Sequence, residues 1–311
     1  MLLTGASGFL GAALVRLFAS ERRVYALSRR PSVSGVEPLA VDLTKGEETE
    51  RVLDEVPFAC CVHAAALADP ELCEKDPEYA WRVNVEATRR LVAVCGKRKK
   101  RLVFLSTDYV FDGRKQGPYT EDDPVCPLQV YGTTKAAAEK LVRESPANLV
   151  IRLPFLFGYA PPPERADFAT DTLRRLWIEE PAAYDHRQLR TPLLREEAAE
   201  GIRLLADSTF PGIVHLVPSE SATKFDLALA FSRHLGKPAA LVRERREGEG
   251  SARARRPASM RLANEKFLEA VSGRFRFRPL DETIARVAER FRKDEESARG
   301  ASEISTSRTT T

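Results

Sequence analysis

The sequence predicts an α/β fold built on a doubly wound parallel sheet, with helices on both faces of the sheet. In the first half of the chain, short apolar runs alternate with longer segments of helical periodicity, as in repeated strand–helix–strand units. A glycine-rich turn, Thr4–Gly11, joins the first apolar run to the first helical segment. The chain has 311 residues and 43% hydrophobic content, enough for a large core and for more than one domain.

The expected elements follow one another closely up to Pro154. The strands are short and apolar, which is typical of strands buried on both faces. They are Met1–Thr4, Arg23–Ser28, Pro38–Val41, Ala59–His63, Arg101–Ser106 and Asn148–Leu153. The expected helices are Phe9–Ser20, Lys45–Glu55, Pro77–Gly96 and Gly132–Glu144.

The regular alternation of apolar runs and helical segments ends after Pro154, and we expect the chain to have three parts. Residues 1–154 form a first domain, and residues 155–292 form a second, smaller α/β portion. Some segments of that portion, such as Thr209–Leu216, are expected to return to the sheet. Residues 293–311 are rich in Ser, Thr, Arg and Glu and lack periodic apolar residues, so we expect a disordered tail.

Composition and charge exclude several classes of protein. The 49 basic residues are accompanied by 45 acidic ones, so the net charge of +4 does not indicate nucleic-acid binding. The basic run Lys97–Arg101 follows an expected helix end, where a solvated turn is favoured over a nucleic-acid patch. Neither the cysteines nor the histidines have metal-ligand or disulfide spacing, so no metal is expected and a reduced, cytoplasmic setting fits best. No signal peptide and no membrane-spanning run are predicted.

The turn after the first strand has the spacing of a dinucleotide-binding loop. Glycines there allow a tight turn and a close approach of the backbone to a phosphate, and the N-terminus of the next helix then faces the anionic pyrophosphate. An ordinary strand–helix turn is the alternative. The residues expected to contact the cofactor are Gly5, Ser7, Gly8, Phe9, Leu10 and Gly11.

The ends of the later strands suggest which cofactor binds. The second strand ends in Arg29-Arg30 without an acidic residue, which favours the 2′-phosphate of NADP, with a solvated basic turn as the alternative. Asp42, with Leu43, follows the third strand and is placed to meet the adenine. Ala64, Ala65 and Ala66 follow the fourth strand and offer small side chains where the cofactor passes.

A proton-delivery arrangement is predicted in the stretch from Ser106 to Lys135. Ser106 and Thr107 end a buried strand, and strand alternation lets only one of them face a substrate. Tyr131 and Lys135 lie four residues apart at the start of a helix and therefore share a face. A free tyrosine has a pKa of about 10, and the lysine is expected to lower it so that the phenol exchanges its proton with a substrate oxygen.

Together these motifs resemble those of the extended short-chain dehydrogenase/reductases, and most closely the dTDP-4-dehydrorhamnose reductase family. The resemblance includes the block Ser106–Gly113 and the pair Tyr131 and Lys135. It implies an NAD(P)-binding Rossmann domain, a C-terminal substrate domain, and an NADPH-dependent reductase, with NADH as an alternative, acting on a nucleotide-linked 4-keto-deoxysugar. It selects Thr107 over Ser106, which makes the catalytic trio Thr107, Tyr131 and Lys135.

The resemblance also implies roles for neighbouring residues. Asn84, polar between apolar residues of a helix, would support Lys135 beside the cofactor, in contrast to a simple surface asparagine. Asp108, Tyr109 and Phe111 would line the substrate side, with loop packing as the equal alternative, and Arg190 would meet a substrate phosphate. Arg152 interrupts an apolar strand, where a structural ion pair is at least as plausible as a ligand role.

The sequence departs from the family on the substrate side. Cys126 stands where relatives often carry asparagine, and Leu193–Glu197 replaces an aromatic or valine residue followed by paired aspartates. Two alternatives therefore stay open: a nucleotide-sugar epimerase that recycles its cofactor, and a non-catalytic NADP-binding regulatory subunit like that of methionine adenosyltransferase. A dehydratase is disfavoured because Tyr109, not glutamate, follows Asp108. The expected partner is a nucleotide sugar, without nucleic acid or membrane, and a homodimer is compatible with the resemblance.

Overall fold

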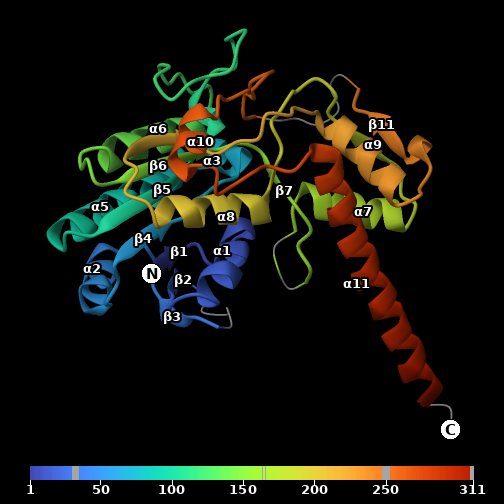
Figure 1. Cartoon of the computed structure of the whole chain (residues 1–311), viewed down its shortest axis with the longest axis horizontal. Helices are drawn as coiled ribbons and strands as arrows, with labels where there is room; N and C mark the ends of the chain where they lie inside the picture. The colour runs from blue at the N-terminus through green and yellow to red at the C-terminus, as the bar shows by residue number, and fades with distance from the viewer. Residues whose placement is uncertain (30–34, 163, 165, 247–252, 309–311) are drawn as a thin grey trace. The chain divides into compact units, whose positions relative to one another are not determined.

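The computed structural model describes residues 1–29, 35–162, 164, 166–246 and 253–308. The chain forms two compact units, each assembled from separate stretches of sequence. The first contains Met1–Leu156, Leu189–Ser221 and Gly250–Phe277, and the second contains Phe157–Gln188, Ala222–Glu249 and Arg278–Thr311. Figure 1 shows the course of the chain by colour, with the elements labelled.

A seven-stranded parallel sheet forms the first unit, as the strand–helix alternation predicts. Its spatial order is β10-β6-β5-β4-β1-β2-β3, and the first six strands of the chain follow the order of a Rossmann fold. β10 comes from the stretch that was expected to return to the sheet, and it pairs with β6. The strands are β1 Leu2–Thr4, β2 Tyr25–Ser28, β3 Glu37–Ala40, β4 Cys60–His63, β5 Arg101–Thr107, β6 Leu149–Leu153 and β10 Gly212–His215.

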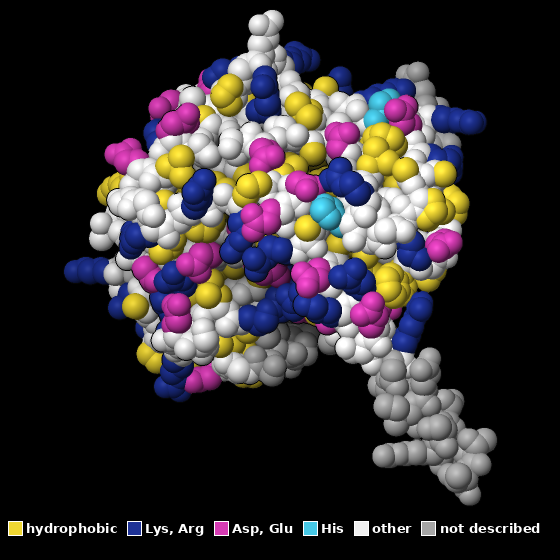
Figure 2. Space-filling model, turned by 45° about the vertical axis from the view of Figure 1, so that its right-hand side comes forward, with side chains coloured by type: hydrophobic (Ala, Val, Ile, Leu, Met, Phe, Trp, Pro, Cys, Tyr) yellow, Lys and Arg dark blue, Asp and Glu magenta, His cyan; other side chains and the backbone are white. Residues whose placement is uncertain are grey.

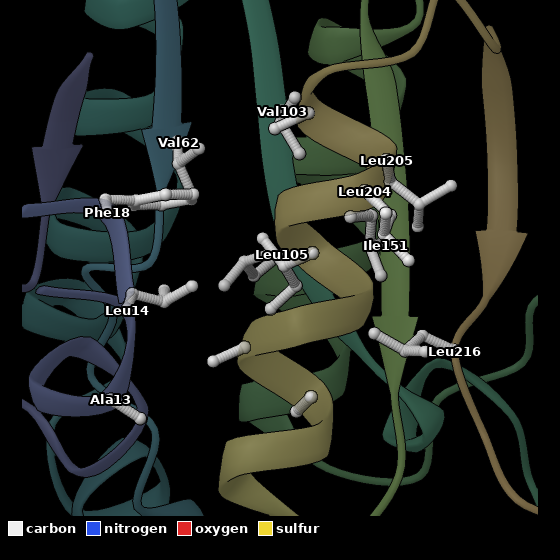
Figure 3. Packing of buried hydrophobic residues seen from close by; sticks show 14 of the residues in the cluster. Ala13, Leu14, Phe18, Val62, Val103, Leu105, Ile151, Leu204, Leu205 and Leu216 are labelled. Atoms are coloured by element: carbon white, nitrogen blue, oxygen red, sulfur yellow. The ribbon is translucent and has the colours of Figure 1, made fainter. Parts of the chain in front are cut away.

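Helices cover both faces of this sheet because alternate strand residues point to opposite faces. On one face, Val103 and Leu105 of β5 share a buried cluster with residues of α1 Phe9–Ala19, α8 Arg195–Ala206 and α10 Glu265–Val271. Figure 3 shows Leu14 and Phe18 of α1 and Leu204 and Leu205 of α8 in this cluster. On the other face, Leu102 and Phe104 pack with α2 Gly46–Glu55, α5 Ala87–Lys97 and α6 Val130–Val142.

The predicted helix Pro77–Gly96 is continuous but contains a change of helix type. It begins as α4 Pro77–Trp81, passes through one π-helical turn, η1 Arg82–Glu86, and continues as α5. Asp76 caps α4 by accepting a hydrogen bond from the backbone N–H of Tyr79. The structure adds the short helix α3 Pro70–Lys75, which the sequence analysis did not predict and whose N-cap is Asp69.

The basic run Lys97–Arg101 binds helix ends inside the first unit. Arg98 donates hydrogen bonds to the carbonyl oxygens of Leu53 and Val56 at the end of α2. Arg101 donates to the carbonyl oxygens of Leu205, Ser208 and Phe210 at and after the end of α8. Carbonyl groups at a helix C-terminus lack intrahelical donors, so these arginines satisfy them. Figure 2 shows basic side chains mingled with acidic ones on the face drawn.

The second unit is smaller and is built from helices and one short sheet. β8 Ala182–Tyr184 and β11 Val242–Glu244 pair in parallel. α9 Lys224–His234 packs against α7 Phe168–Trp177 and α11 Leu280–Arg308, and Thr223 and Asp226 form a capping box at its start. The remaining short elements of the chain are η2 Asp108–Val110, β7 Leu156–Phe157, β9 Leu193–Leu194 and η3 Ala239–Leu241.

The structure differs from the expected disordered tail over residues 293–308, which continue α11. The Nζ of Lys293 lies 2.7 Å from a carboxylate oxygen of Glu289, and Ser297 Oγ donates to Lys293 O over 2.7 Å. Residues 293–299 bury no side chain, and such local pairs support a helix there that apolar periodicity could not predict. Within the described residues, no helix is long and apolar enough to cross a membrane.

Candidate functional site

The glycine loop lies against the segment that follows β4. Gly5 has φ +73°, and a Cβ atom there would lie 2.6 Å from the backbone nitrogen of Ala65. Thr4 Oγ1 accepts a hydrogen bond from that same nitrogen over 3.1 Å. Glycine is therefore required at position 5 both by the left-handed backbone and by the close approach of Ala64 and Ala65.

The residues of the loop fit an anionic cofactor. Gly8 is the N-cap of α1 and provides no side-chain hydrogen bond to the helix, so no side chain blocks the helix end. Free backbone N–H groups and the helix dipole together favour a phosphate at such an end. Ser7 is exposed, Phe9 and Leu10 are half-buried, and Gly11 is buried in the first turn of α1.

Arg29 and Asp42 lie near each other at the carboxyl ends of β2 and β3. Burial raises the pKa of Asp42, but hydrogen bonds from Thr44 and the charge of Arg29 lower it by more, so the pKa lies below its usual value. Asp42 Oδ1 also accepts hydrogen bonds from the backbone N–H and the hydroxyl of Thr44, and Leu43 O accepts one from Arg90. Arg29 is exposed, with its guanidinium 3.3 Å from the hydroxyl of Tyr79. Arg30 lies outside the described residues.

Asn84 is buried in the π-helical turn, where its amide connects three segments. Its Oδ1 accepts from Leu67 N over 2.8 Å, and its Nδ2 donates to Leu67 O over 3.2 Å and to Thr134 Oγ1 over 2.9 Å. Leu67 follows the Ala64–Ala66 segment, and Thr134 precedes Lys135 on α6. Asn84 thus fastens the segment after β4 to α6, and a π-helical turn at such a position is common in functional sites.

The strand end separates Ser106 from Thr107, as strand alternation predicts. Ser106 Oγ donates to Glu139 Oε1 over 2.6 Å. Thr107 Oγ1 accepts from Tyr109 N over 3.2 Å and lies 3.1 Å from Asp108 Oδ1. Burial raises the pKa of Tyr131, and the Thr107 hydroxyl lies close enough to the phenol to act on that pKa in the opposite direction. Of the two candidate hydroxyls, Thr107 is therefore the one beside Tyr131.

The start of α6 is held in place by several contacts. Gln129 is its N-cap and accepts from Gly132 N over 2.8 Å, while Glu74 accepts from Val130 N over 2.8 Å. A Cβ atom at Gly132 would lie inside the contact distance of Tyr109 O, so the helix approaches η2 more closely than any other residue allows. The ring of Tyr109 meets that of Tyr131 edge to face, with centroids 6.2 Å apart.

Burial controls the ionisation of the residues gathered here. It raises the pKa of Tyr131, and the nearby carboxyl of Asp108 raises it further. Burial lowers the pKa of Lys135 to about 7, and the Nζ of that lysine lies 3.9 Å from the ring centroid of Phe104. The pKa of Tyr131 is thus raised in this structure, mainly by burial, whereas the sequence-based expectation was that Lys135 would lower it.

Three further residues were expected on the substrate side, and they lie in different surroundings. Tyr109 is half-buried beside Tyr131, and the guanidinium of Arg190 lies 5.2 Å from the ring centroid of Tyr109. Arg190 also donates to Pro257 O over 3.1 Å. Phe111, in contrast, is fully buried and stacks on Tyr119 with centroids 4.2 Å apart. The loop-packing alternative therefore describes Phe111.

Sequence reasoning missed Gln129, Gly132 and Glu139. A polar residue just before an alanine-rich helix could have indicated the cap at Gln129. Glu139 lies four residues after Lys135, and that spacing places it on the same helix face. Its buried partners come from β5 and β6, so only the fold reveals them. Within the described ranges, no cluster of His, Cys, Asp and Glu is suited to hold a metal ion.

The parallel sheet, the glycine loop and the tyrosine–lysine helix define an extended short-chain dehydrogenase/reductase. The chain belongs to the RmlD substrate binding domain family, which it matches over residues 1–293.

Known proteins similar to this chain include named reductases and a subunit of methionine adenosyltransferase. The probable low-salt glycan biosynthesis reductase Agl14 of Haloferax volcanii is 31% identical, covering 77% of this chain and 81% of that protein. Methionine adenosyltransferase 2 subunit beta of Danio rerio is 30% identical, with coverages of 84% and 82%. The crystal structure of a hypothetical dTDP-4-dehydrorhamnose reductase from Sulfolobus tokodaii has a TM-score of 0.79 and 28% identity, covering 90% of this chain and 97% of the other.

Proposed function

We propose that this chain is an NADPH-dependent reductase, with NADH as an alternative donor, that reduces the 4-keto group of a nucleotide-linked deoxysugar. The observation that carries the proposal is the meeting of Thr107 with Tyr131 at the start of α6, with Lys135 on the same helix. The similarity to a hypothetical dTDP-4-dehydrorhamnose reductase makes dTDP-4-dehydrorhamnose the first substrate to test.

The cofactor would be held by residues at the carboxyl ends of β1 to β4. We assign the pyrophosphate to Gly5, Ser7 and Gly8–Gly11, because the uncapped end of α1 provides backbone donors. Arg29 is assigned to the 2′-phosphate, and Asp42 with Leu43 to the adenine side. Ala64–Ala66 line the path of the cofactor, and Lys135 is assigned to its ribose, with Asn84 holding both elements together. When bound, the cofactor supplies the hydride.

The protein's own residues would deliver the proton. Thr107 and Tyr131 donate hydrogen bonds to the substrate's carbonyl oxygen, and Tyr131 transfers its proton as that oxygen becomes an alkoxide. Because burial keeps the pKa of Tyr131 above its ordinary value, the phenol stays protonated at neutral pH. A protonated phenol suits ketone reduction better than alcohol oxidation. Asp108, Tyr109 and Arg190 are assigned to the substrate side.

Replacing the proton donor tests this assignment. Tyr131→Phe should lower kcat by roughly 10²–10⁴-fold while leaving the dissociation constant for NADPH nearly unchanged. The loss of NADPH absorbance with dTDP-4-keto-deoxysugars measures turnover, and cofactor fluorescence measures binding. Tyr25→Phe, in β2, is the matched control and should retain activity. If the wild-type protein oxidises no NADPH with any such sugar, the proposed function is wrong.

A regulatory subunit is the second candidate, favoured by the similarity to methionine adenosyltransferase 2 subunit beta. A regulatory subunit would bind NADP and change the activity of a methionine adenosyltransferase catalytic subunit. Tyr131→Phe would preserve that effect because no proton transfer is involved. Equal stimulation by the wild-type and variant proteins, without sugar reduction, would identify this class. An epimerase would instead retain bound cofactor and show no net NADPH consumption.

A further inference from the structure

A buried ion pair ties α6 to the ends of β5 and β6. Arg152 donates two hydrogen bonds to Glu139, from Nε to Oε1 over 3.0 Å and from Nη2 to Oε2 over 2.8 Å. The side chains of Arg152 and Glu139 are 2% and 4% exposed. Ser106 Oγ adds a third hydrogen bond to Oε1 of Glu139 over 2.6 Å. The carboxylate of Glu139 is thus held by donors from two neighbouring strands.

The position of Glu139 connects it to all three proposed catalytic residues. Tyr131, Lys135 and Glu139 follow one another at intervals of four on α6, so they lie along one helix face, and all three are buried. Ser106 directly precedes Thr107 at the end of β5. The hydrogen bond from Ser106 to Glu139 therefore joins the strand that carries Thr107 to the helix that carries Tyr131 and Lys135.

Glu139 also acts on Lys135 electrostatically. Burial lowers the pKa of Lys135, and the negative charge of Glu139 opposes that effect. Burial lowers the pKa of His215, and Arg152, whose Nη1 lies 3.2 Å from His215 Nε2, lowers it further. Of the two charges of the ion pair, Glu139 is the one that acts on the pKa of Lys135.

No other titratable group described near this face of α6 provides a negative charge to Lys135 as Glu139 does. Burial lowers the pKa of His63 to about 3, so this histidine is neutral. Burial raises the pKa of Asp108 and weakens its ionisation. Glu74 accepts from Val130 N at the helix start. The titratable and charged groups near Tyr131, Lys135 and Glu139 in the described part of the chain include His63 of β4, Asp108 and Tyr109 of η2, Cys73 and Glu74 of α3, and Arg152 of β6.

Stability alone does not explain a buried pair of this kind. Desolvation of two charges offsets much of their attraction, and apolar replacements of similar volume are often neutral or stabilising. Hydrophobic residues could join α6 to β6 equally well in this core. The pair contributes instead a fixed negative charge one helical turn from Lys135 and a fixed anchor for Ser106.

We propose that Glu139 is a positioning residue for the reductase site: it fixes the end of β5 against α6 and keeps Lys135 in its ammonium form. Its effect on turnover rests on the proposed function, whereas its effect on Lys135 does not. With the ammonium form required, activity falls as the pH rises through the pKa of Lys135. Loss of the Glu139 charge lowers that pKa and moves the falling limb to lower pH.

Two variants and two readouts test the proposal. Glu139→Gln removes the charge and leaves Arg152 unpaired, and this variant can fail to fold. The double variant Glu139→Gln with Arg152→Met removes both charges at similar volume and keeps the question testable. The titration of the Lys135 ammonium, followed by NMR, should move to lower pH by roughly one to two units in either folded variant. The falling limb of the kcat profile should move with it.

Controls separate a structural role from the proposed one. Glu144→Gln removes an exposed carboxylate just beyond α6 and should leave both the titration and the profile unchanged. Glu139→Asp should restore most of the wild-type titration. A folded double variant whose Lys135 titrates as in the wild type overturns the proposal. If the wild-type protein is inactive as a reductase but the Lys135 titration still shifts in the variants, the proposed function is wrong while the effect of Glu139 on Lys135 stands. The two proposals can therefore fail separately.

Discussion

Desolvation sets the charge of the side chains that meet at the carboxyl edge of the sheet. The pKa of Lys135 is lowered to about 7, because burial disfavours its ammonium more strongly than the carboxylate of Glu139 favours it. Tyr131 responds in the opposite direction, since burial disfavours the phenolate. Tyr131 is a neutral phenol at pH 7 in the folded and the unfolded chain alike, whereas the lowered pKa of Lys135 costs folding stability at this pH.

The protein should become more stable when Lys135 is replaced by methionine. The unfolded lysine binds its proton up to about pH 10.5, whereas the folded one loses it near 7, so the unfolded state binds more protons between these values. Wild-type stability should rise with pH through this window. Lys135→Met should add about 2–4 kcal/mol to the free energy of unfolding at pH 7, and the gain should shrink toward pH 10.

Urea unfolding at pH 7 and pH 9 measures this effect. Lys140→Met, on the exposed side of the same helix, is the control and should change stability by less than about 0.5 kcal/mol. Equal destabilisation by both substitutions would contradict the account of Lys135 as a desolvated cation.

At the scale of elements, close contacts and helix ends explain how the site is held. Gly132 lets α6 approach η2, and a side chain there would meet Tyr109 O. Gly96 lies in α5 with nothing within 4 Å of the position that a Cβ would occupy. Both glycines lie in helices, but Gly132 is closely packed against η2, whereas Gly96 has open space beside it.

The two glycines should respond to alanine in opposite directions. Gly132→Ala should destabilise the protein by about 2–4 kcal/mol and separate Tyr131 from Thr107, because the helix must shift away from η2. Gly96→Ala should stabilise by about 0.5–1 kcal/mol, since alanine has the higher helix propensity. Thermal unfolding of the two variants measures both effects. If Gly132→Ala leaves the stability unchanged, then η2 can move away from α6 at little cost and the expected effect is wrong.

Arg101 should matter more for stability than its exposed neighbour in the basic run. Arg101→Ala leaves carbonyl groups near the end of α8 without their donor and should lower the free energy of unfolding by about 1–3 kcal/mol. Lys97→Ala breaks only an exposed ion pair with Asp54 and should change it by less than about 1 kcal/mol. Chemical denaturation compares them, and similar losses would contradict a capping role for Arg101.

Local sequence patterns predicted most of the helices and strands. They could not predict which residues distant in the sequence contact one another. The alternation of apolar runs gave the sheet and the glycine loop, because both depend on neighbours within a few residues. The π-helical turn at Asn84 adds one residue to a helix without altering its apolar faces, so no periodicity indicates it. Arg152 was ambiguous between an ion pair and a ligand because its partner Glu139 lies on another element. Glu139 also accepts a hydrogen bond from Ser106, which leaves Thr107 as the hydroxyl beside Tyr131.

For the molecule as a whole, buried neutral histidines link folding to pH. Burial lowers the pKa of His63 and of His215 to about 3. His63 hydrogen-bonds with Thr4 over 2.7 Å and with Thr88 over 3.0 Å, which suits a neutral ring. In the unfolded chain both rings take up protons below about pH 6.5.

Stability should therefore fall as the pH drops from 6.5 toward 3. The unfolded state binds more protons in this window, so each histidine should account for a loss of about 2 kcal/mol between pH 6.5 and pH 5. Replacing both with glutamine should flatten the dependence by about twice that amount. Guanidinium unfolding at pH 7, 6 and 5 measures the slope. An unchanged slope in the folded double variant would show that other groups cause acid unfolding.

The late arrival of β10 has a consequence for synthesis of the chain on the ribosome. Residues 149–153 form β6 early, but its neighbour β10 and the covering helix α8 are translated only after residues 157–188. Until then the nascent sheet has an open, apolar edge, and such edges attract other strands. A fragment ending at Leu156 should therefore aggregate, and the first unit should mature only once residues 189–221 and 250–277 have left the ribosome.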